Sequence, residues 1–241
     1  MIIWIASYPK SGNTWVRLFL NSYFNLNDNN IISQSFPIMD HLKQFEIDFV
    51  NFGEIVKGWE LMQNFINLNQ KTNYLKTHNA MCTINNYKFT NKDNTLGAIY
   101  LVRDPRDVLV SYAHHLGLSH EEVLNNMLNS YNGERGEYEG KKYKKSIMGK
   151  WSDHYNSWKS FKDREILIVR YEDLVKNSEK EFLRILNYLN RIDNTKIEKK
   201  KLLESIGQTS FEKLSNNEKK FGFKEASNHG VFFRKGVVGD W

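Results

Sequence analysis

The chain opens with an apolar run at residues 2–6 (IIWIA) that leads directly into the polar segment SYPKSGNTWVR at residues 7–17. The run predicts a buried strand, and the apolar spacing after the turn predicts an amphipathic helix. Together they form a cradle for an anion: Gly12 lets the backbone come close, the first helical amides and the helix dipole face the anion, and Lys10 adds a positive charge. This unit predicts an open α/β fold that binds a phosphate or sulfate group at the turn.

The turn differs from a Walker A loop in the place of its lysine. Walker A requires G-x-x-x-x-G-K-[ST], in which the lysine follows the second glycine and a hydroxyl binds magnesium. Here Lys10 precedes Gly12, the only glycine of the turn. This order disfavours a magnesium-dependent kinase or NTPase. For the four residues 9–12 alone, an ordinary turn with a solvated lysine is an open alternative.

Two more strand and helix units follow along the chain. Residues 99–102 and 166–169 have the pattern of buried strands. After the first, Asp-Pro at residues 104–105 predicts the N-cap and first residue of a helix. After the second, a capping box is expected to begin at Ser178, and another at Thr209. The alternation of strands and helices favours a parallel sheet with helices on both faces.

Arg103 and Ser111 are candidates for binding one phosphate. Arg103 stands at a strand end and Ser111 two turns into the following helix, so a guanidinium fork and a hydroxyl can converge. The alternative pairs Arg103 with Asp104 or Asp107 and makes Ser111 a buried helix serine. Arg106 and Asp107 are expected to be exposed helix charges.

Lys76 and His78 are candidates for the chemistry itself. Residues 73–78 (NYLKTH) predict a short strand, and side chains two residues apart leave a strand on the same face. A histidine, whose pKa is about 6.5, can remove a proton from an acceptor, and a lysine can balance the charge of a transferred group. The alternative is a purely structural histidine.

Five segments together resemble the sulfotransferases of the soluble, cytosolic type, which use 3′-phosphoadenosine 5′-phosphosulfate (PAPS). They are YPKSG-x-TW at residues 8–15, LKTH at 75–78, YLVRDPRDVLVSY at 100–112, YEDL at 171–174 and RKGVVGDW at 234–241. The resemblance implies one P-loop-like domain over residues 1–241, with a central parallel sheet. It also implies sulfuryl transfer from PAPS to a hydroxyl or amine of a small acceptor, with 3′-phosphoadenosine 5′-phosphate (PAP) as product.

The resemblance also implies roles for individual residues. His78 would be the general base, Lys10 would neutralise the leaving phosphate, and Lys76 would assist at the transferred group. Arg103 and Ser111 would hold the 3′-phosphate. The other donor-binding residues that it implies are Ser11, Gly12, Asn13, Thr14, Trp15, Tyr171, Thr209, Phe211, Phe233, Arg234, Lys235 and Gly236.

Composition limits the remaining possibilities. The chain has 241 residues, 40% of them hydrophobic, which suits one core. Its single cysteine, Cys82, excludes an internal disulfide, and no Cys/His cluster has metal-ligand spacing. The net charge of +6 fits an anionic ligand, and the first apolar run is far shorter than the roughly 20 residues of a membrane span. We expect a cytoplasmic monomer or homodimer without metal, nucleic-acid or membrane partners.

The acceptor cannot be identified from the sequence, since the loops at residues 36–59 and 114–150 match no signature. Residues 133–149, with four glycines, predict a mobile loop that by resemblance helps to cover the acceptor. The lysine-rich stretches at residues 141–145 and 196–201 are expected to be solvated faces.

Two other functions stay open. One is a non-catalytic binder of nucleotides or polyanions, and the other is a P-loop-like phosphotransferase, which magnesium dependence would reveal. Among single residues, Tyr171 could equally be a packed aromatic and Thr209 a helix cap. The resembling family normally continues beyond the position of Trp241, so a C-terminally truncated chain is one interpretation.

Overall fold

A central sheet of four parallel strands organises the computed structural model, which describes residues 1–25 and 34–241. The strand order is β2-β1-β5-β8, with β1 at Ile2–Ser7, β2 at Asn73–Thr77, β5 at Thr95–Val102 and β8 at Ile166–Arg170. All six residues of β1 are buried, as expected for a strand covered on both faces. The predicted parallel sheet is confirmed.

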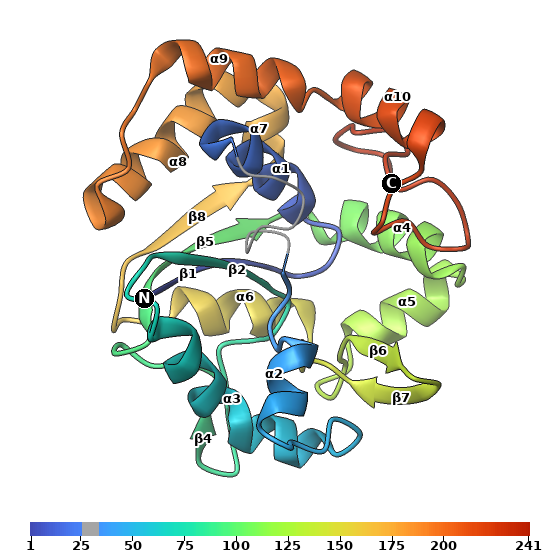
Figure 1. The fold of residues 1–241 in the computed structure, drawn as a ribbon. Helices are drawn as coiled ribbons and strands as arrows, with labels where there is room; N and C mark the ends of the chain where they lie inside the picture. Colours follow the sequence, from blue (N-terminus) through green and yellow to red (C-terminus); the bar gives the residue numbers. More distant parts are fainter. Residues whose placement is uncertain (26–33) are drawn as a thin grey trace.

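Helices cover both faces of the sheet (Figure 1). One face carries α1, α7, α8 and α9, and the other carries α2, α3 and α6. Their bounds are Asn13–Phe24 for α1, Tyr171–Lys176 for α7, Ser178–Asp193 for α8, Lys199–Gln208 for α9, Met39–Gln44 for α2, Phe52–Asn67 for α3 and Trp151–Lys159 for α6. Because side chains alternate along a strand, β1 sends Ile3 and Ile5 into the first core and Trp4 into the second.

The remaining elements lie mainly at the carboxyl ends of the strands. Figure 1 shows α4, α5, α10 and the hairpin of β6 and β7 on this side. Their bounds are Pro105–Leu116 for α4, His120–Met127 for α5, Arg135–Tyr138 for β6, Lys141–Lys144 for β7 and Phe211–Phe221 for α10, and a further short hairpin joins β3 (Thr83–Ile84) to β4 (Tyr87–Lys88). None of the helices described is long and apolar enough to cross a bilayer.

Within the predicted loop at residues 133–149, residues 135–144 form a hairpin, so the prediction of a loop is wrong for these residues. β6 and β7 pair antiparallel through a two-residue turn at Glu139 and Gly140. Both turn residues have positive φ angles, 51° and 74°, which is the requirement of the type I′ hairpin turn. The glycine that suggests a loop in the sequence therefore serves to close a hairpin.

Helix starts agree with the sequence in one case and differ by one residue in two. Asp104 caps α4, where its carboxylate accepts a backbone N–H of the first turn. For α8 the cap is Asn177 instead of Ser178, and its side-chain oxygen accepts the backbone N–H of Lys180. Asparagine and serine are about equally good at this position. For α10 the cap is Ser210, and Thr209 ends α9 with its hydroxyl donated to a backbone carbonyl.

Gly97 in β5 gives a direct test of packing between the sheet and α8. An added Cβ would lie 2.2 Å from Tyr188 Oη and 3.2 Å from the carbonyl oxygen of Glu165, to which that hydroxyl donates. Gly97→Ala should therefore lower the free energy of unfolding by about 2 kcal/mol in urea denaturation. Gly207→Ala, where a Cβ meets nothing within 4 Å in α9, should raise it by up to about 1 kcal/mol. Unchanged stability of Gly97→Ala would contradict this packing.

Candidate active site

A cavity of about 1290 Å³ opens where β1, β2 and β5 end. Parallel strands bring their carboxyl ends to one edge of a sheet, so residues far apart in the sequence meet there. The predicted site residues that line it are Lys10, Gly12, Asn13, Thr14, Trp15, Lys76, His78, Arg103, Ser111, Tyr171, Thr209, Phe211, Phe233, Arg234, Lys235 and Gly236. Ser11 is fully buried and is not among the lining residues.

The turn after β1 has the geometry of the predicted anion cradle. Gly12 precedes α1 with a φ angle of 97°, and an added Cβ would lie 2.8 Å from Tyr171 Cδ2, so only glycine fits. Asn13 Nδ2 donates to the carbonyl oxygen of Ile5 at 2.9 Å and ties the helix start to β1. The N-terminus of α1 is thus held at the cavity wall.

Lys10 lies in this cradle among other charges. Burial lowers its pKa to about 8, and the nearby cations Lys76 and Arg103 lower it while Glu225 raises it. Its Nζ lies 3.8 Å from the centre of the Phe232 ring. An anion bound here would stabilise the protonated ammonium and raise the pKa again.

Glu225 is a site residue that sequence reasoning missed. Its Oε2 accepts from Thr14 Oγ1 at 3.0 Å, its Oε1 lies 2.5 Å from Arg17 Nη2, and Lys76 Nζ is 3.8 Å away. Although burial raises the pKa of this carboxyl, Arg17 and Lys76 lower it to about 2. Arg17 was also missed, because the fifth residue of the helix after the turn matches no phosphate motif. The cradle therefore already holds an internal anion.

His78 is held in one orientation by the end of β1. Its Nδ1 lies 2.7 Å from the carbonyl oxygen of Ser7, a contact in which Nδ1–H donates and Nε2 is left as the acceptor of the ring. Burial, followed by the charge of Lys76, lowers its pKa to about 3. Behind it, His154 Nε2 lies 3.2 Å from the His78 carbonyl and Tyr100 Oη 2.8 Å from His154 Nδ1. The ring is neutral and can accept a proton at Nε2.

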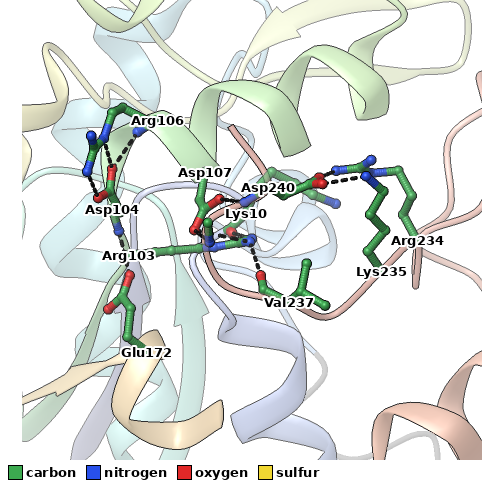
Figure 2. A network of polar contacts seen from close by, with 11 residues as sticks. Lys10, Arg103, Asp104, Arg106, Asp107, Glu172, Arg234, Lys235, Val237 and Asp240 are labelled. Carbon is green, nitrogen blue, oxygen red and sulfur yellow. Dashed lines mark hydrogen bonds and ion pairs between the residues drawn. The ribbon is translucent and has the colours of Figure 1, made fainter. Parts of the chain in front are cut away.

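Arg103 contacts two separate parts of the cavity wall (Figure 2). It donates from Nη1 to the carbonyl oxygen of Lys10 at 3.2 Å and from Nη2 to that of Val237 at 3.1 Å. Its guanidinium carbon lies 4.2 Å from the centre of the Tyr171 ring. The alternative partner Asp107 is 4.0 Å away, so Arg103 lies near this carboxylate and also lines the cavity.

The prediction that Asp107 is an exposed charge is wrong. The residue is 1% exposed, and its two carboxylate oxygens accept from the backbone N–H groups of Gly239 at 2.9 Å and Asp240 at 2.8 Å. Arg106 is exposed as expected and pairs with Asp104 at 2.7 Å. Asp107 thus attaches the C-terminal segment to α4, a partnership that no local pattern reveals.

The C-terminal segment brings further cations to the cavity. Arg234 and Lys235 both pair with the carboxylate of Asp240, as Figure 2 shows. Gly236, with a φ angle of 66°, packs so closely on Phe211 that a Cβ would overlap the ring. This close contact explains the glycine of the RKG motif at residues 234–236.

Aromatic rings line the part of the cavity next to α1. Trp15 and Tyr171 meet edge to face with their ring centres 6.2 Å apart, and Phe233 packs on Phe232 at 5.1 Å. The hydroxyl of Thr209 is engaged with a helix carbonyl at 2.8 Å, although the residue still lines the cavity. These rings offer flat surfaces for a nucleobase.

Comparisons with known proteins agree with this geometry. A family model described as a sulfotransferase domain matches residues 2–241. The chain belongs to the sulfotransferase family. Its relatives include sulfotransferase 1B1 of Mus musculus, 29% identical over 98% of this chain and 75% of the relative, and sulfotransferase 1C2 of Homo sapiens, 25% identical over the same shares. The predicted sulfotransferase activity class is confirmed.

Solved structures that contain PAP share the fold of this sulfotransferase. Mouse sulfotransferase SULT7A1 complexed with PAP is 22% identical, with a TM-score of 0.64 over 100% of this chain and 77% of that one. Retinol dehydratase in complex with androsterone and PAP is 21% identical, with a TM-score of 0.62 over 99% and 74%. The P-loop-like α/β fold expected from the sequence is confirmed.

A separate part of the cavity wall in this sulfotransferase comes from α4, α5 and the β6–β7 hairpin. Glu134 at the base of the hairpin pairs with Lys145 at 3.8 Å, and the cavity also meets Lys142 and Lys144. Burial would raise the pKa of the Glu134 carboxyl, but the nearby charges of Lys145 and Lys76 outweigh it and hold this pKa below its usual value. Lys141 and Lys142 are exposed, as expected for a solvated face, whereas Lys144 and Lys145 are half-buried.

The described residues contain no group of three or more His, Cys, Asp or Glu side chains that could hold a metal ion.

Proposed function

We propose that the sulfotransferase transfers a sulfuryl group from PAPS to a hydroxyl or amine of a small acceptor, with His78 as general base. One observation carries this proposal: a neutral, oriented His78 lies in the same cavity as the cations Lys10, Lys76 and Arg103. A base and fixed cations are what removal of the acceptor proton and departure of an anionic phosphate require.

The donor would lie across the cavity with its two phosphates apart. Its 5′-phosphate would bind at the first turn of α1 beside Lys10, and its 3′-phosphate at Arg103 and Ser111. Its adenine would pack among Trp15 and Tyr171, and the remaining implied donor contacts are Ser11, Gly12, Asn13, Thr14, Thr209, Phe211, Phe233, Arg234, Lys235 and Gly236. The related structures that carry PAP in the same fold support this arrangement.

Transfer would proceed in line. The acceptor oxygen or nitrogen attacks sulfur and loses its proton to His78 Nε2, while the bond from sulfur to the bridging oxygen of PAPS breaks. The electron pair leaves on the 5′-phosphate of PAP, where Lys10 neutralises it, and Lys76 balances charge on the sulfuryl oxygens. Holding donor and acceptor in this alignment supplies much of the rate enhancement.

Arg103→Ala tests the donor assignment. In calorimetric titration, wild type should bind PAP tightly and prefer it to AMP and to ATP with magnesium. The variant should lose about 100-fold in PAP affinity, because a charged hydrogen-bonding partner of the 3′-phosphate is gone. Arg106→Ala, which removes an exposed guanidinium three residues away, should bind PAP like wild type.

Two results would count against the proposal. Equal affinity of wild type for PAP and AMP would contradict recognition of a 3′-phosphate. Tighter binding of ATP that requires magnesium would favour the phosphotransferase alternative. A small-molecule acceptor, a single domain over residues 1–241, metal-independent transfer, a cytoplasmic location and a monomeric or homodimeric state remain predictions that accompany this function.

A further inference from the structure

The carboxylate of Glu225 lies at the first turn of α1. Glu225 belongs to the segment at residues 222–241, which follows α10 and is far from α1 in the sequence. Its Oε2 accepts from Thr14 Oγ1 at 3.0 Å, and Thr14 is the second residue of α1. Arg17 Nη2 lies 2.5 Å from Oε1 and Lys76 Nζ 3.8 Å from Oε2. Three donor groups from two elements thus converge on one carboxylate.

The guanidinium of Arg17 is positioned to bind an anion at the first turn of α1. Its side chain is 3% exposed, and its Nε donates to Asn13 Oδ1 at 2.8 Å, which fixes the guanidinium behind the cradle. Its Nη2 donates to Thr14 Oγ1 at 3.1 Å as well as to Glu225. A buried guanidinium is costly unless an anion compensates it. In the described part of the chain, Glu225 is the carboxylate within 4.0 Å of Arg17.

A second carboxylate of the same segment has a similar position. Asp240 pairs with Arg234 and Lys235, two of the cations that line the cavity, and its backbone is held by Asp107 (Figure 2). The segment at residues 222–241 therefore places carboxylates of its own on cations at both of its ends. A bisphosphate ligand would need the same cations.

We propose that Thr14 and Arg17 join Lys10 in binding the 5′-phosphate of the donor, and that the Glu225 carboxylate occupies this subsite, next to Lys76, until the donor displaces it. Two anions cannot share this subsite, because they would repel one another at close range. This inference rests on the proposed donor, and it assigns to Arg17 a binding role that the sequence motifs do not. Donor affinity is then reduced by the free energy needed to release Glu225.

Glu225→Gln tests the displacement. The amide keeps the size of the side chain and removes the competing charge, so PAP and adenosine 5′-monophosphate should bind about tenfold more tightly, an effect within the usual range of coupling between sites. Adenosine 3′-monophosphate, which has no 5′-phosphate, should bind as in wild type. Glu212→Gln, which neutralises an exposed carboxylate of α10, should change none of the three affinities.

Arg17→Lys supplies the complementary result. It keeps the charge but loses the fork that reaches both Thr14 and the anion, so it should weaken PAP and adenosine 5′-monophosphate and leave adenosine 3′-monophosphate unchanged. Circular dichroism and thermal unfolding of each variant would establish that it is folded.

Weaker PAP binding by Glu225→Gln would overturn the proposal. It would show that the Glu225 carboxylate stabilises the donor-bound form. Equal changes for all three nucleotides would also overturn it.

Binding of pyrophosphate separates this inference from the proposed function. If wild type does not prefer PAP to AMP but Glu225→Gln binds pyrophosphate more tightly, the subsite stands and the donor assignment fails.

Discussion

Replacing His78 with glutamine is expected to lower kcat for sulfuryl transfer about 10³-fold, within the range that a positioned general base contributes. Glutamine can still donate to the Ser7 carbonyl, which lies 2.7 Å from His78 Nδ1, but it cannot take up the acceptor proton. The measurement is turnover of radiolabelled PAPS with the best acceptor from a panel of phenols, alcohols, amines and sugars. PAP affinity should remain close to that of wild type, because His78 is not assigned a contact with the donor.

A matched control is available for this experiment. His120→Gln, at the exposed start of α5, should retain wild-type turnover. Retention of more than about a tenth of the wild-type kcat by His78→Gln would remove the general-base role, since a base of this kind contributes at least about 10²-fold. The low pKa of His78, about 3, also predicts that turnover has no acid limb near pH 6.5.

Stability should fall steeply in mild acid, by about 5 kcal/mol between pH 6.5 and 4.5. Burial lowers the pKa of His78 to about 3 and that of His154 to about 4, whereas both should titrate near 6.5 once unfolded. Below pH 6.5 the unfolded chain therefore binds a proton at each of these two residues that the folded chain does not, and each contributes about 1.4 kcal/mol per pH unit. Burial also lowers the pKa of His115 to about 4, and this partly exposed ring adds a smaller loss. Urea denaturation across this pH range measures the effect.

His154→Gln isolates the contribution of one histidine to this dependence. The amide nitrogen can donate to the His78 carbonyl and the amide oxygen can accept from Tyr100, while no proton is taken up. The slope of stability against pH should fall by about 1.4 kcal/mol per unit, the contribution of one proton. Stability that does not change above pH 4.5 would contradict neutral burial of both rings. Below that pH carboxylates such as Glu225, with a pKa of about 2, add their own loss.

The meeting of Lys10, Lys76 and Arg103 at one sheet edge could be predicted because the segments that carry them are local. Strand, turn and glycine are contiguous at residues 2–12, and the strand ends at Lys76 and Arg103 carry their own polar side chains. Once the sheet is parallel, these ends meet at one edge without further information. The same reasoning predicts both buried faces of β1, whose side chains alternate between two cores.

The long-range polar contacts of the cavity could not be predicted in this way. Arg17 and Glu225 form an ion pair across 208 residues, and Asp107 accepts the backbone N–H of Asp240 across 133 residues. These partnerships depend on the path of residues 222–241 over the sheet edge, which carries no periodic pattern. A charged helix residue is normally expected to be exposed. The burial of the Asp107 carboxylate by a segment 133 residues away therefore could not be predicted.

The β6–β7 hairpin forms a two-stranded sheet of its own, separate from the four central strands. The hairpin is one contiguous stretch of chain that follows α5 and precedes α6 in the sequence. Its side chains can therefore be replaced together without breaking a hydrogen bond of the central sheet, whose strand ends lead to His78 and Lys10. New acceptor preferences could arise in this chain, by evolution or in a designed library, through changes confined to about a dozen neighbouring codons, a length typical of a short hairpin with its flanks.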